Sequence, residues 1–225
     1  MNFKNEFLDF VKKNNPEWRI KGLLSCDKDV LVFGSDTKVL STIFELLCKP
    51  IVLSIAKKHG YQVEEPRQTV YPDFTLLKNK EDKEKIAVDI KTTYRKFRAD
   101  GSIAPFGFTL GSYTSFIRND KKNIHYPYSE YKEHWIIGFV YTRSLPENIS
   151  LSYKLSDFEK IPCPYKDVKL FVQEKYKIAG LKPGSGNTTN IGSVKTSDID
   201  EFGLGNGNFA NTGEKAFLDY WKKYK

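Results

Sequence analysis

The feature that most constrains the fold of this chain is an apolar run at residues 135–142, with the sequence WIIGFVYT. A strand that faces water on one side alternates apolar and polar side chains, because only its other face is buried. Here both faces would be apolar, so the strand needs a covering layer on each side. The run is too short to cross a membrane, which takes about 20 residues. The sequence therefore predicts a central strand in a sheet covered on both faces.

The rest of the chain provides further strands and the helices that would cover them. Apolar residues at helical spacing predict helices at residues 3–13 and 39–58, and Pro50 is expected to kink or split the second helix. Residues 71–77 and 86–94 are rich in strand-forming residues. We also expect a hairpin at 20–33, strands at 106–113 and 168–178, a loop at 181–192 and a helix at 217–224. These elements predict one mixed α/β domain over residues 1–225, with a mixed central β-sheet flanked by helices.

Charge and cysteine content indicate the partner and the compartment. The formal net charge is +8, which favours an acidic partner, and nucleic acid is the commonest one. The three cysteines, Cys26, Cys48 and Cys163, include no CxxC pair, which argues against a disulfide framework and a structural zinc site. The N-terminus lacks the apolar core of a signal peptide. We therefore expect a soluble, cytoplasmic protein with no membrane partner.

The most informative polar residues are Asp73, Asp89 and Lys91. Side chains alternate along a strand, so Asp89 and Lys91 share one face, while Val88 and Ile90 share the other. If the two strands pair, Asp73 can approach Asp89. Two converging carboxylates repel each other unless a cation lies between them, and oxygen ligands favour Mg²⁺. Lys91 could then orient or deprotonate a water, or stabilise charge on a phosphate, as metal-assisted phosphodiester hydrolysis requires.

The same residues also have simpler explanations. A Pro-Asp followed by Asp-x-Lys often arises by chance, Asp73 could cap a turn, and Asp89 could pair with Lys91 on a solvated face. The context favours a site, because an aspartate inside the apolar stretch 86–90 is costly to bury without a partner. Glu45 lies opposite the apolar stripe of its helix and, by itself, is interpreted as a solvated glutamate.

Residues 184–192 (GSGNTTNIG) form a run of small hydrogen-bonding residues. The run matches neither a P-loop nor a dinucleotide-binding pattern. Asparagine and threonine can bond base edges, and glycine allows close backbone approach, so a groove-reading loop is one interpretation. A surface turn is the other. The basic segment 78–98 would suit a polyanion, or would simply be a solvated strand end.

Several longer stretches together resemble a known family. In chain order they are GSDTKVLSTIFEL (34–46), KHGYQVEEP (58–66), YPDFTL (71–76), DIKTTY (89–94), FTLGSYTSFIRN (108–119), HWIIGFVYTR (134–143), GSGNTTNIGS (184–193) and FLDYW (217–221). So many colinear blocks indicate homology, which the short acidic pattern alone would not. On these blocks the chain resembles the EcoRV-type restriction endonucleases, which are type II enzymes of the PD-(D/E)XK nuclease superfamily.

The resemblance implies a restriction-endonuclease-like fold and a homodimeric, Mg²⁺-dependent enzyme. Such an enzyme cuts double-stranded DNA at a short palindrome, GATATC or close to it, and leaves blunt ends with 5′-phosphates. Asp73 and Asp89 would bind the metal, with the Ile90 carbonyl as a further ligand. Lys91 would be the catalytic lysine. Glu45 would be an auxiliary acidic residue at the metal, which contradicts the solvated interpretation above.

The resemblance also implies three sets of DNA contacts. The recognition loop in the major groove would consist of Gly184, Ser185, Gly186, Asn187, Thr188, Thr189 and Asn190. A minor-groove loop would contain Gln68 and Thr69. The residues near the phosphate backbone would be Thr37, Thr92, Thr93, Ser115, Arg118 and Lys122.

A palindromic site makes dimerisation a functional need, because each protomer reads one half-site and cuts one strand. We expect the dimerisation part near residues 20–33 and 145–165. The host would need a cognate DNA methyltransferase, which is not expected to bind this protein.

Three departures from the family pattern bear on DNA binding. The minor-groove loop is one residue shorter, the connection at residues 95–107 is longer, and the chain ends soon after Trp221. The resemblance implies that a C-terminal extension with phosphate contacts is absent. Weaker binding at moderate salt, a flatter salt dependence and retained specificity are expected.

Two other functions are open at this point. A structure-directed DNA repair or recombination nuclease on the same fold would keep the carboxylates and the lysine, but would need no base-reading loop. A catalytically inactive DNA-binding protein would need none of the four active-site residues. An Asp89→Ala substitution separates these two classes, because only a nuclease loses an activity while still binding DNA.

Overall fold

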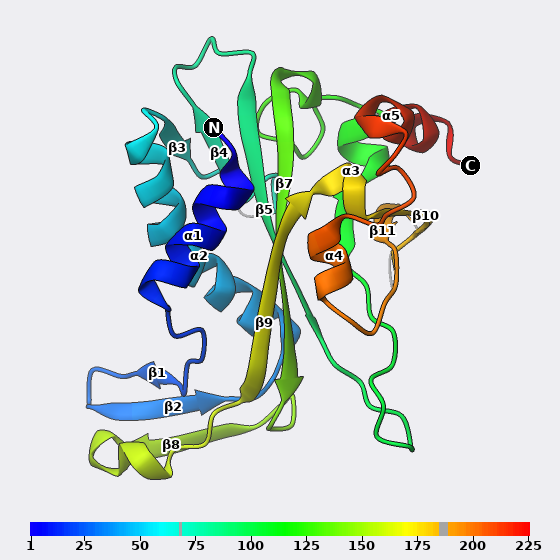
Figure 1. Cartoon of the computed structure of the whole chain (residues 1–225). Helices are drawn as coiled ribbons and strands as arrows, with labels where there is room; N and C mark the ends of the chain where they lie inside the picture. The colour runs from blue at the N-terminus through cyan, green and yellow to red at the C-terminus, as the bar shows by residue number, and fades with distance from the viewer. Residues whose placement is uncertain (68, 185–188) are drawn as a thin grey trace.

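The computed structural model describes residues 1–67, 69–184 and 189–225 (Figure 1). Its largest sheet has five strands in the order β3-β4-β5-β7-β9. The strands are β3 (Gln62–Glu64), β4 (Phe74–Leu77), β5 (Lys85–Tyr94), β7 (Tyr131–Arg143) and β9 (Tyr165–Glu174). The predicted apolar run lies inside β7, which pairs in parallel with β5 and antiparallel with β9. The mixed α/β fold with a mixed sheet is thus confirmed.

Helices cover one face of this sheet. α1 (Phe3–Asn14) and α2 (Thr37–Lys58) pack against it (Figure 1) and bury an apolar cluster with β5 and β7. In that cluster Phe44 of α2 stacks on Phe139 of β7, with ring centroids 4.4 Å apart. The even-numbered residues of β5, including Val88 and Ile90, belong to this face. The odd-numbered ones, Asp89 among them, therefore face the other side.

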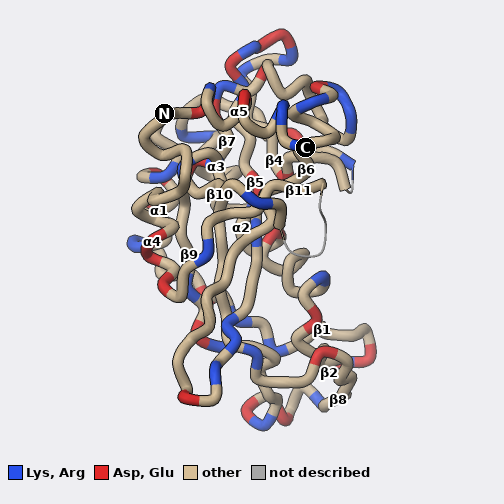
Figure 2. Tube along the Cα trace, turned by 90° about the vertical axis from the view of Figure 1, so that its right-hand side faces the viewer, with Lys and Arg blue, Asp and Glu red and all other residues tan. Residues whose placement is uncertain are grey.

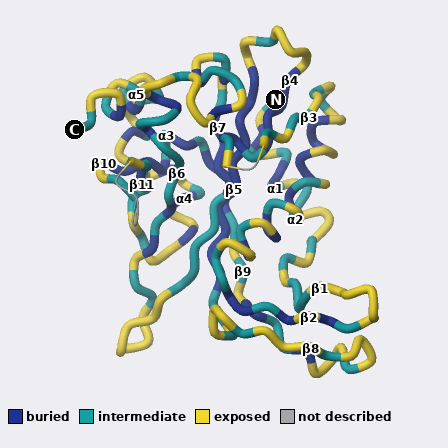
Figure 3. Tube along the Cα trace, turned by 180° about the vertical axis from the view of Figure 1, so that it is seen from behind, coloured by how far each residue is buried: buried dark blue, intermediate teal, exposed yellow. Residues whose placement is uncertain are grey.

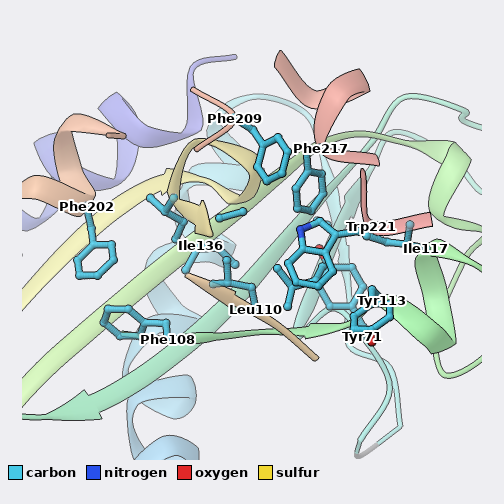
Figure 4. Packing of buried hydrophobic residues seen from close by; sticks show 14 of the residues in the cluster. Tyr71, Phe108, Leu110, Tyr113, Ile117, Ile136, Phe202, Phe209, Phe217 and Trp221 are labelled. Carbon is cyan, nitrogen blue, oxygen red and sulfur yellow. The ribbon is translucent and has the colours of Figure 1, made fainter. Parts of the chain in front are cut away.

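The second face is covered by a smaller sheet and three short helices. The sheet has the order β10-β11-β6 and contains β6 (Thr109–Ser112), β10 (Ala179–Pro183) and β11 (Asn190–Ser193). The helices are α3 (Lys175–Ile178), α4 (Asp200–Leu204) and α5 (Gly213–Lys223). Their aromatic and aliphatic side chains form one apolar cluster with Ile136 and Val140 of β7 (Figure 4). Both faces of β7 are covered, as its apolar sequence requires.

α2 runs without interruption through Pro50, so the expected split is wrong. Asp36 caps the N-terminus of the helix, because its side chain accepts hydrogen bonds from the N–H groups of Lys38 and Val39. The packing of Cys48, Ile51 and Val52 in the core stabilises the turns around the proline, and such packing outweighs local preference. By length and hydropathy α2 could also cross a membrane. Its apolar side chains, however, pack against the sheet.

A third sheet lies at one end of the molecule (Figures 1 and 3). It contains β1 (Leu23–Leu24), β2 (Asp29–Phe33) and β8 (Ser150–Lys154) in the order β1-β2-β8. The hairpin predicted at residues 20–33 is confirmed as β1 and β2. A short 3-10 helix, Leu155–Lys160, follows β8. The two stretches expected at the dimer interface, 20–33 and 145–165, thus each contribute strands to one sheet.

Several predicted elements have different bounds: β4 begins only at Phe74, and α5 begins already at Gly213. The strand expected at 106–113 is β6 followed by a π-helical turn, Tyr113–Ile117, because the Ser112 side chain caps that turn by accepting from the Ser115 N–H. The strand expected at 168–178 ends at Glu174, where α3 begins. The loop expected at 181–192 is shorter, since β10 and β11 pair on either side of it.

Candidate active site

The acidic pair and the lysine meet where β4 begins beside β5. Phe74 pairs with Val88, which places Asp73, just before β4, beside Asp89. Asp73 Oδ2 accepts a hydrogen bond of 2.6 Å from the Ile90 N–H. Asp89 Oδ2 forms an ion pair of 2.7 Å with Lys91 Nζ. The structure thus brings Asp73, Asp89 and Lys91 together through strand pairing.

Burial determines the electrostatics of this group. Asp89 is 2% exposed. Burial, and then the nearby Asp89 charge, raise the pKa of Asp73 well above its ordinary range. Burial opposes the charge of Lys91, but Asp89 and Asp73 outweigh that effect and raise the Lys91 pKa. Two carboxylates that lie close together with only one lysine repel each other, and a further cation would reduce this repulsion.

Glu45 lies beside this group, on α2. Its carboxylate accepts a hydrogen bond of 3.4 Å from Ser41 Oγ, one helical turn earlier. Burial, opposed by Lys91 and assisted by Asp89, raises the Glu45 pKa. The interpretation of Glu45 as a solvated residue is therefore wrong. Glu45 is only partly exposed, and it lines a cavity together with Asp73.

A cavity of about 280 Å³ opens beside the carboxylates. Its walls include Asp73, Asp89 and Lys91, together with Thr69, Ser115 and Asn190 from three other segments of the chain. A second cavity of about 390 Å³ contains Glu45 and shares Asp73 and Thr69 with the first. Asp73 therefore lies between the two cavities, and the residues implied for chemistry and for DNA contact line a common surface.

The donor set suits a divalent cation bound by oxygen atoms. Within the described part of the chain, no three His, Cys, Asp or Glu side chains form a ready-made metal-ligand group. A metal here would therefore take the two aspartates and complete its shell with other oxygens. Mg²⁺ is usually bound in this way, by one or two carboxylates, waters and a substrate phosphate.

The arms of the expected recognition loop approach this cavity. The Gly184 N–H donates to the Asn190 carbonyl, with 2.9 Å between the two atoms, and closes the base of the loop. The Thr189 carbonyl accepts from the Tyr113 N–H at 3.1 Å. The residues Gln68, Ser185, Gly186, Asn187 and Thr188, which were assigned to base contacts, lie outside the described residues.

The residues expected near phosphates have different surroundings. Thr37 is the first residue of α2, and Thr92 and Thr93 are partly buried near the end of β5. Arg118 contacts the Tyr224 carbonyl and lies 4.8 Å from the centroid of the Tyr113 ring. Lys122 is exposed. Lys and Arg occur over the whole molecule, interspersed with acidic residues (Figure 2).

Several residues that line the two cavities were not predicted from the sequence. Ser41 precedes Glu45 by one helical turn, and this spacing could have revealed it. Ser112 caps the π-helical turn and lines the cavity with Ser115. Asn123 reaches the cavity from a distant loop, where its carbonyl accepts from the Tyr71 N–H at 3.0 Å. No local pattern marks Asn123, because only the tertiary fold brings it to the site.

Comparison with known proteins agrees with the geometry. The family described as "Restriction endonuclease EcoRV" matches residues 14–225. "Type II restriction enzyme EcoRV" of Escherichia coli is 48% identical over 227 residues, which cover 100% of this chain and 90% of that enzyme. The match spans the sheet, both cavities and the arms of the loop. The family prediction made from the sequence blocks is thereby confirmed. This chain belongs to the EcoRV family of type II restriction endonucleases.

Proposed function

We propose that this protein is a homodimeric, Mg²⁺-dependent endonuclease that cuts double-stranded DNA at GATATC or a closely related palindrome. The products would be blunt ends with 5′-phosphates. The observation that carries the proposal is the cavity of about 280 Å³, in which Asp73, Asp89 and Lys91 share walls with Thr69 and Asn190. Hydrolysis and base reading would thus take place on one surface.

The chain's own residues would hold and orient the reactants. The ion pair with Asp89 keeps Lys91 Nζ at one position, from which the ammonium can orient a water or stabilise charge on the phosphate. The Ile90 N–H holds the Asp73 carboxylate. Water would attack phosphorus in line, the bond from phosphorus to the 3′-oxygen would break, and the 3′-oxygen would leave as a hydroxyl.

Mg²⁺, when bound, would neutralise charge on the phosphate and polarise the attacking water. Asp73 and Asp89 would hold it, with the Ile90 carbonyl as a further ligand and Glu45 as an auxiliary acid. The raised pKa of Asp73 supports this role, because a cation would stabilise the ionised carboxylate that burial and Asp89 disfavour.

DNA would be read by the loop at residues 184–190 from the major groove and by Gln68 and Thr69 from the minor groove. Thr37, Thr92, Thr93, Ser115 and Lys122 would lie near phosphates. Arg118 would first have to leave the Tyr224 carbonyl, which it contacts here. The placement of Asn190 and Ser115 in one cavity supports this arrangement.

The sheet β1-β2-β8 would form the dimer interface, within the single domain proposed for residues 1–225. Six large apolar side chains of this region are at least 37% exposed, and they are Leu23, Leu24, Leu31, Leu151, Leu155 and Phe158. All lie within the ranges 20–33 and 145–165. Cross-strand pairing places Leu23 and Leu31 on one face of the sheet and Leu24 and Leu151 on the other. Exposed apolar side chains of this kind are typical of an interaction surface. A cytoplasmic location and a host methyltransferase that does not bind the enzyme complete the proposal.

Digestion of two matched plasmids tests the proposal. One plasmid contains a single GATATC and the other none, and both are incubated with Mg²⁺ and with EDTA. A single blunt linear product, from the first plasmid and in Mg²⁺ only, is expected. The Asp89→Ala variant should bind the site without cutting it.

Each alternative predicts a different outcome. Cleavage of both plasmids at branches or junctions, without sequence preference, would indicate the repair or recombination nuclease instead. Binding without cleavage by the wild type in every metal would indicate the inactive DNA-binding protein. Cleavage of both plasmids at one shared sequence would reject GATATC and keep the enzyme class.

A further inference from the structure

A lysine with no hydrogen-bond partner is buried behind the active site. Lys175 is 1% exposed, and its Nζ has no hydrogen-bond partner among the described residues. Three aromatic rings surround the ammonium, with ring centroids 3.8 Å away for Tyr71, 5.1 Å for Phe116 and 5.6 Å for Tyr128. A desolvated cation over aromatic faces is attracted by their quadrupoles, so the rings hold the lysine in place.

The rings themselves form one stack. Tyr71 stacks on Phe116 at 4.6 Å, and Tyr128 stacks on His134 at 3.9 Å. The Tyr71 hydroxyl is 2.7 Å from His134 Nδ1. Tyr71 therefore contacts Phe116 with the face of its ring and His134 with its hydroxyl. A shift of Lys175 would remove the closest contact of this ring with a charge.

Two of the three rings around the lysine belong to segments of the proposed active site. Tyr71 precedes Pro72 and Asp73, and its carbonyl accepts from the His125 N–H at 2.8 Å. Phe116 lies in the π-helical turn that carries Ser115. Lys175 is the first residue of α3, which leads through β10 to Gly184 and the loop beyond it. Lys175 thus connects the segment 175–184, here called the loop-bearing arm, to the segment that contains Tyr71 and Asp73.

Burial of the Lys175 ammonium is unfavourable, so the presence of a lysine at this position needs an explanation. Burial lowers the pKa of Lys175 to about 7, although Asp89, Glu214 and Asp73 favour its charge. Burial raises the pKa of Glu214 to about 7, although Lys175 favours the ionised form. An apolar side chain would fill the same space without this cost.

We propose that Lys175 is a positioning residue, which couples the placement of the loop-bearing arm to the placement of Asp73 through its contact with the Tyr71 ring. The proposal rests on the function proposed above, since it concerns the same carboxylate. Lys175 would touch neither DNA nor metal. It acts by keeping Tyr71, and hence the start of β4, in one position.

Lys175→Met tests the proposal, because it removes the charge and keeps an unbranched apolar side chain. Cleavage of the GATATC plasmid at saturating DNA is expected to fall at least tenfold. The Mg²⁺ concentration for half-maximal rate should rise several-fold, while DNA affinity in EDTA stays within about threefold of wild type. Lys85→Met is the matched control, because Lys85 is also fully buried over a ring, that of Tyr126, but is paired with Glu130. It should lower the unfolding midpoint and leave the cleavage rate and the Mg²⁺ dependence within about threefold.

A double-mutant cycle separates positioning from stability. Tyr71→Leu should reproduce the Lys175→Met cleavage defect, and the double variant should be no worse than either single one. Additive losses of cleavage rate would overturn the proposal. So would a Lys175→Met enzyme that cleaves like Lys85→Met, or one that loses binding and cleavage in equal measure.

If Lys175→Met does not fold, Phe116→Leu decides the matter, because it removes one wall of the lysine site and leaves the charge in place. A several-fold rise in the half-maximal Mg²⁺ concentration is expected, and an unchanged value would overturn the proposal. Failure of the wild type to cleave would instead reject the proposed function, so the two failures are distinguishable.

Discussion

At the scale of single residues, Lys91 is held by an ion pair with Asp89. The two aspartates raise its pKa against the effect of burial, so it stays positive near neutral pH. Strand alternation by itself predicts that Asp89 and Lys91 share one face. Glu45, by contrast, could not be placed from helix periodicity, because its environment depends on where α2 crosses β5.

Lys91→Met should reduce cleavage by a factor of at least about 10², which is typical for loss of a group that assists proton transfer or stabilises charge. Site binding in EDTA should remain. Lys132→Met is the control, since Lys132 is exposed and pairs with Glu84 on the surface. Gel-shift and plasmid assays measure the two properties separately, and parallel losses in both would argue against a role of Lys91 in the chemistry.

His134 should make the fold sensitive to acid. Burial, and then Lys175, lower the pKa of His134 well below its ordinary value of 6.5. Below about pH 6.5 the unfolded chain binds a proton there while the folded chain does not, so the stabilising contribution is lost as pH falls. Between about pH 6 and pH 5 the wild type should lose up to about 1.4 kcal/mol more unfolding free energy than His134→Phe. Urea titrations at each pH measure this, and parallel curves for the two proteins would contradict it.

At the scale of the elements, a glycine in β7 makes room for an aromatic ring of β9. Gly138 of β7 lies opposite Phe171 of β9, and a Cβ at this position would collide with the Phe171 ring. The apolar run predicted the strand but not this contact, which depends on the partner strand. At Pro50 the local sequence is misleading instead: proline normally breaks a helix, but it is tolerated here because core packing stabilises α2.

Gly138→Ala should therefore destabilise the fold by about 1–3 kcal/mol, as overpacking of a core usually does. Gly203→Ala is the control, because the Cβ it adds on α4 would lie 3.8 Å from Phe171 Cβ, at ordinary contact distance. Alanine in a helix should be neutral or stabilising by up to about 1 kcal/mol. Equal unfolding midpoints for both variants in urea would show that the Phe171 ring can move aside to accommodate the added methyl group.

At the scale of the whole molecule, the sheet β1-β2-β8 lies at one end (Figure 3), and its paired residues Leu23 and Leu31 form an exposed apolar patch on one face. Its strands come from the chain segments 23–33 and 150–154, so the patch exists only in the folded protein. In the proposed dimer this patch would be buried between two copies.

Leu31→Lys should weaken self-association at least tenfold, because it places a charge on the sheet face that Leu31 shares with Leu23. Leu31 is 45% exposed, so the fold of the single chain should not depend on it. Leu204→Lys is the control, as Leu204 on α4 is 69% exposed and far from that sheet in sequence. Sedimentation velocity over a range of concentrations measures the effect, and an unchanged dimer in Leu31→Lys would place the interface elsewhere.

Some features of this protein follow from the sequence by itself. The double-sided apolar run predicted β7 and a covered sheet, strand alternation predicted the shared face of Asp89 and Lys91, and the colinear blocks predicted the family. Each of these depends on residues that are close along the chain, where side-chain periodicity is preserved whatever the rest of the fold does.

Other features were decided by the tertiary structure alone. The entry of Glu45 into the site, the arrival of Asn123 and Asn190 at one cavity, and the burial of Lys175 against Tyr71 join segments far apart in sequence. Their roles depend on desolvation and on neighbours across the fold, and neither quantity is present in a local pattern. The physical reason is that burial is a property of the packed molecule, so it exists only once the layers on both sides of the sheet are in place.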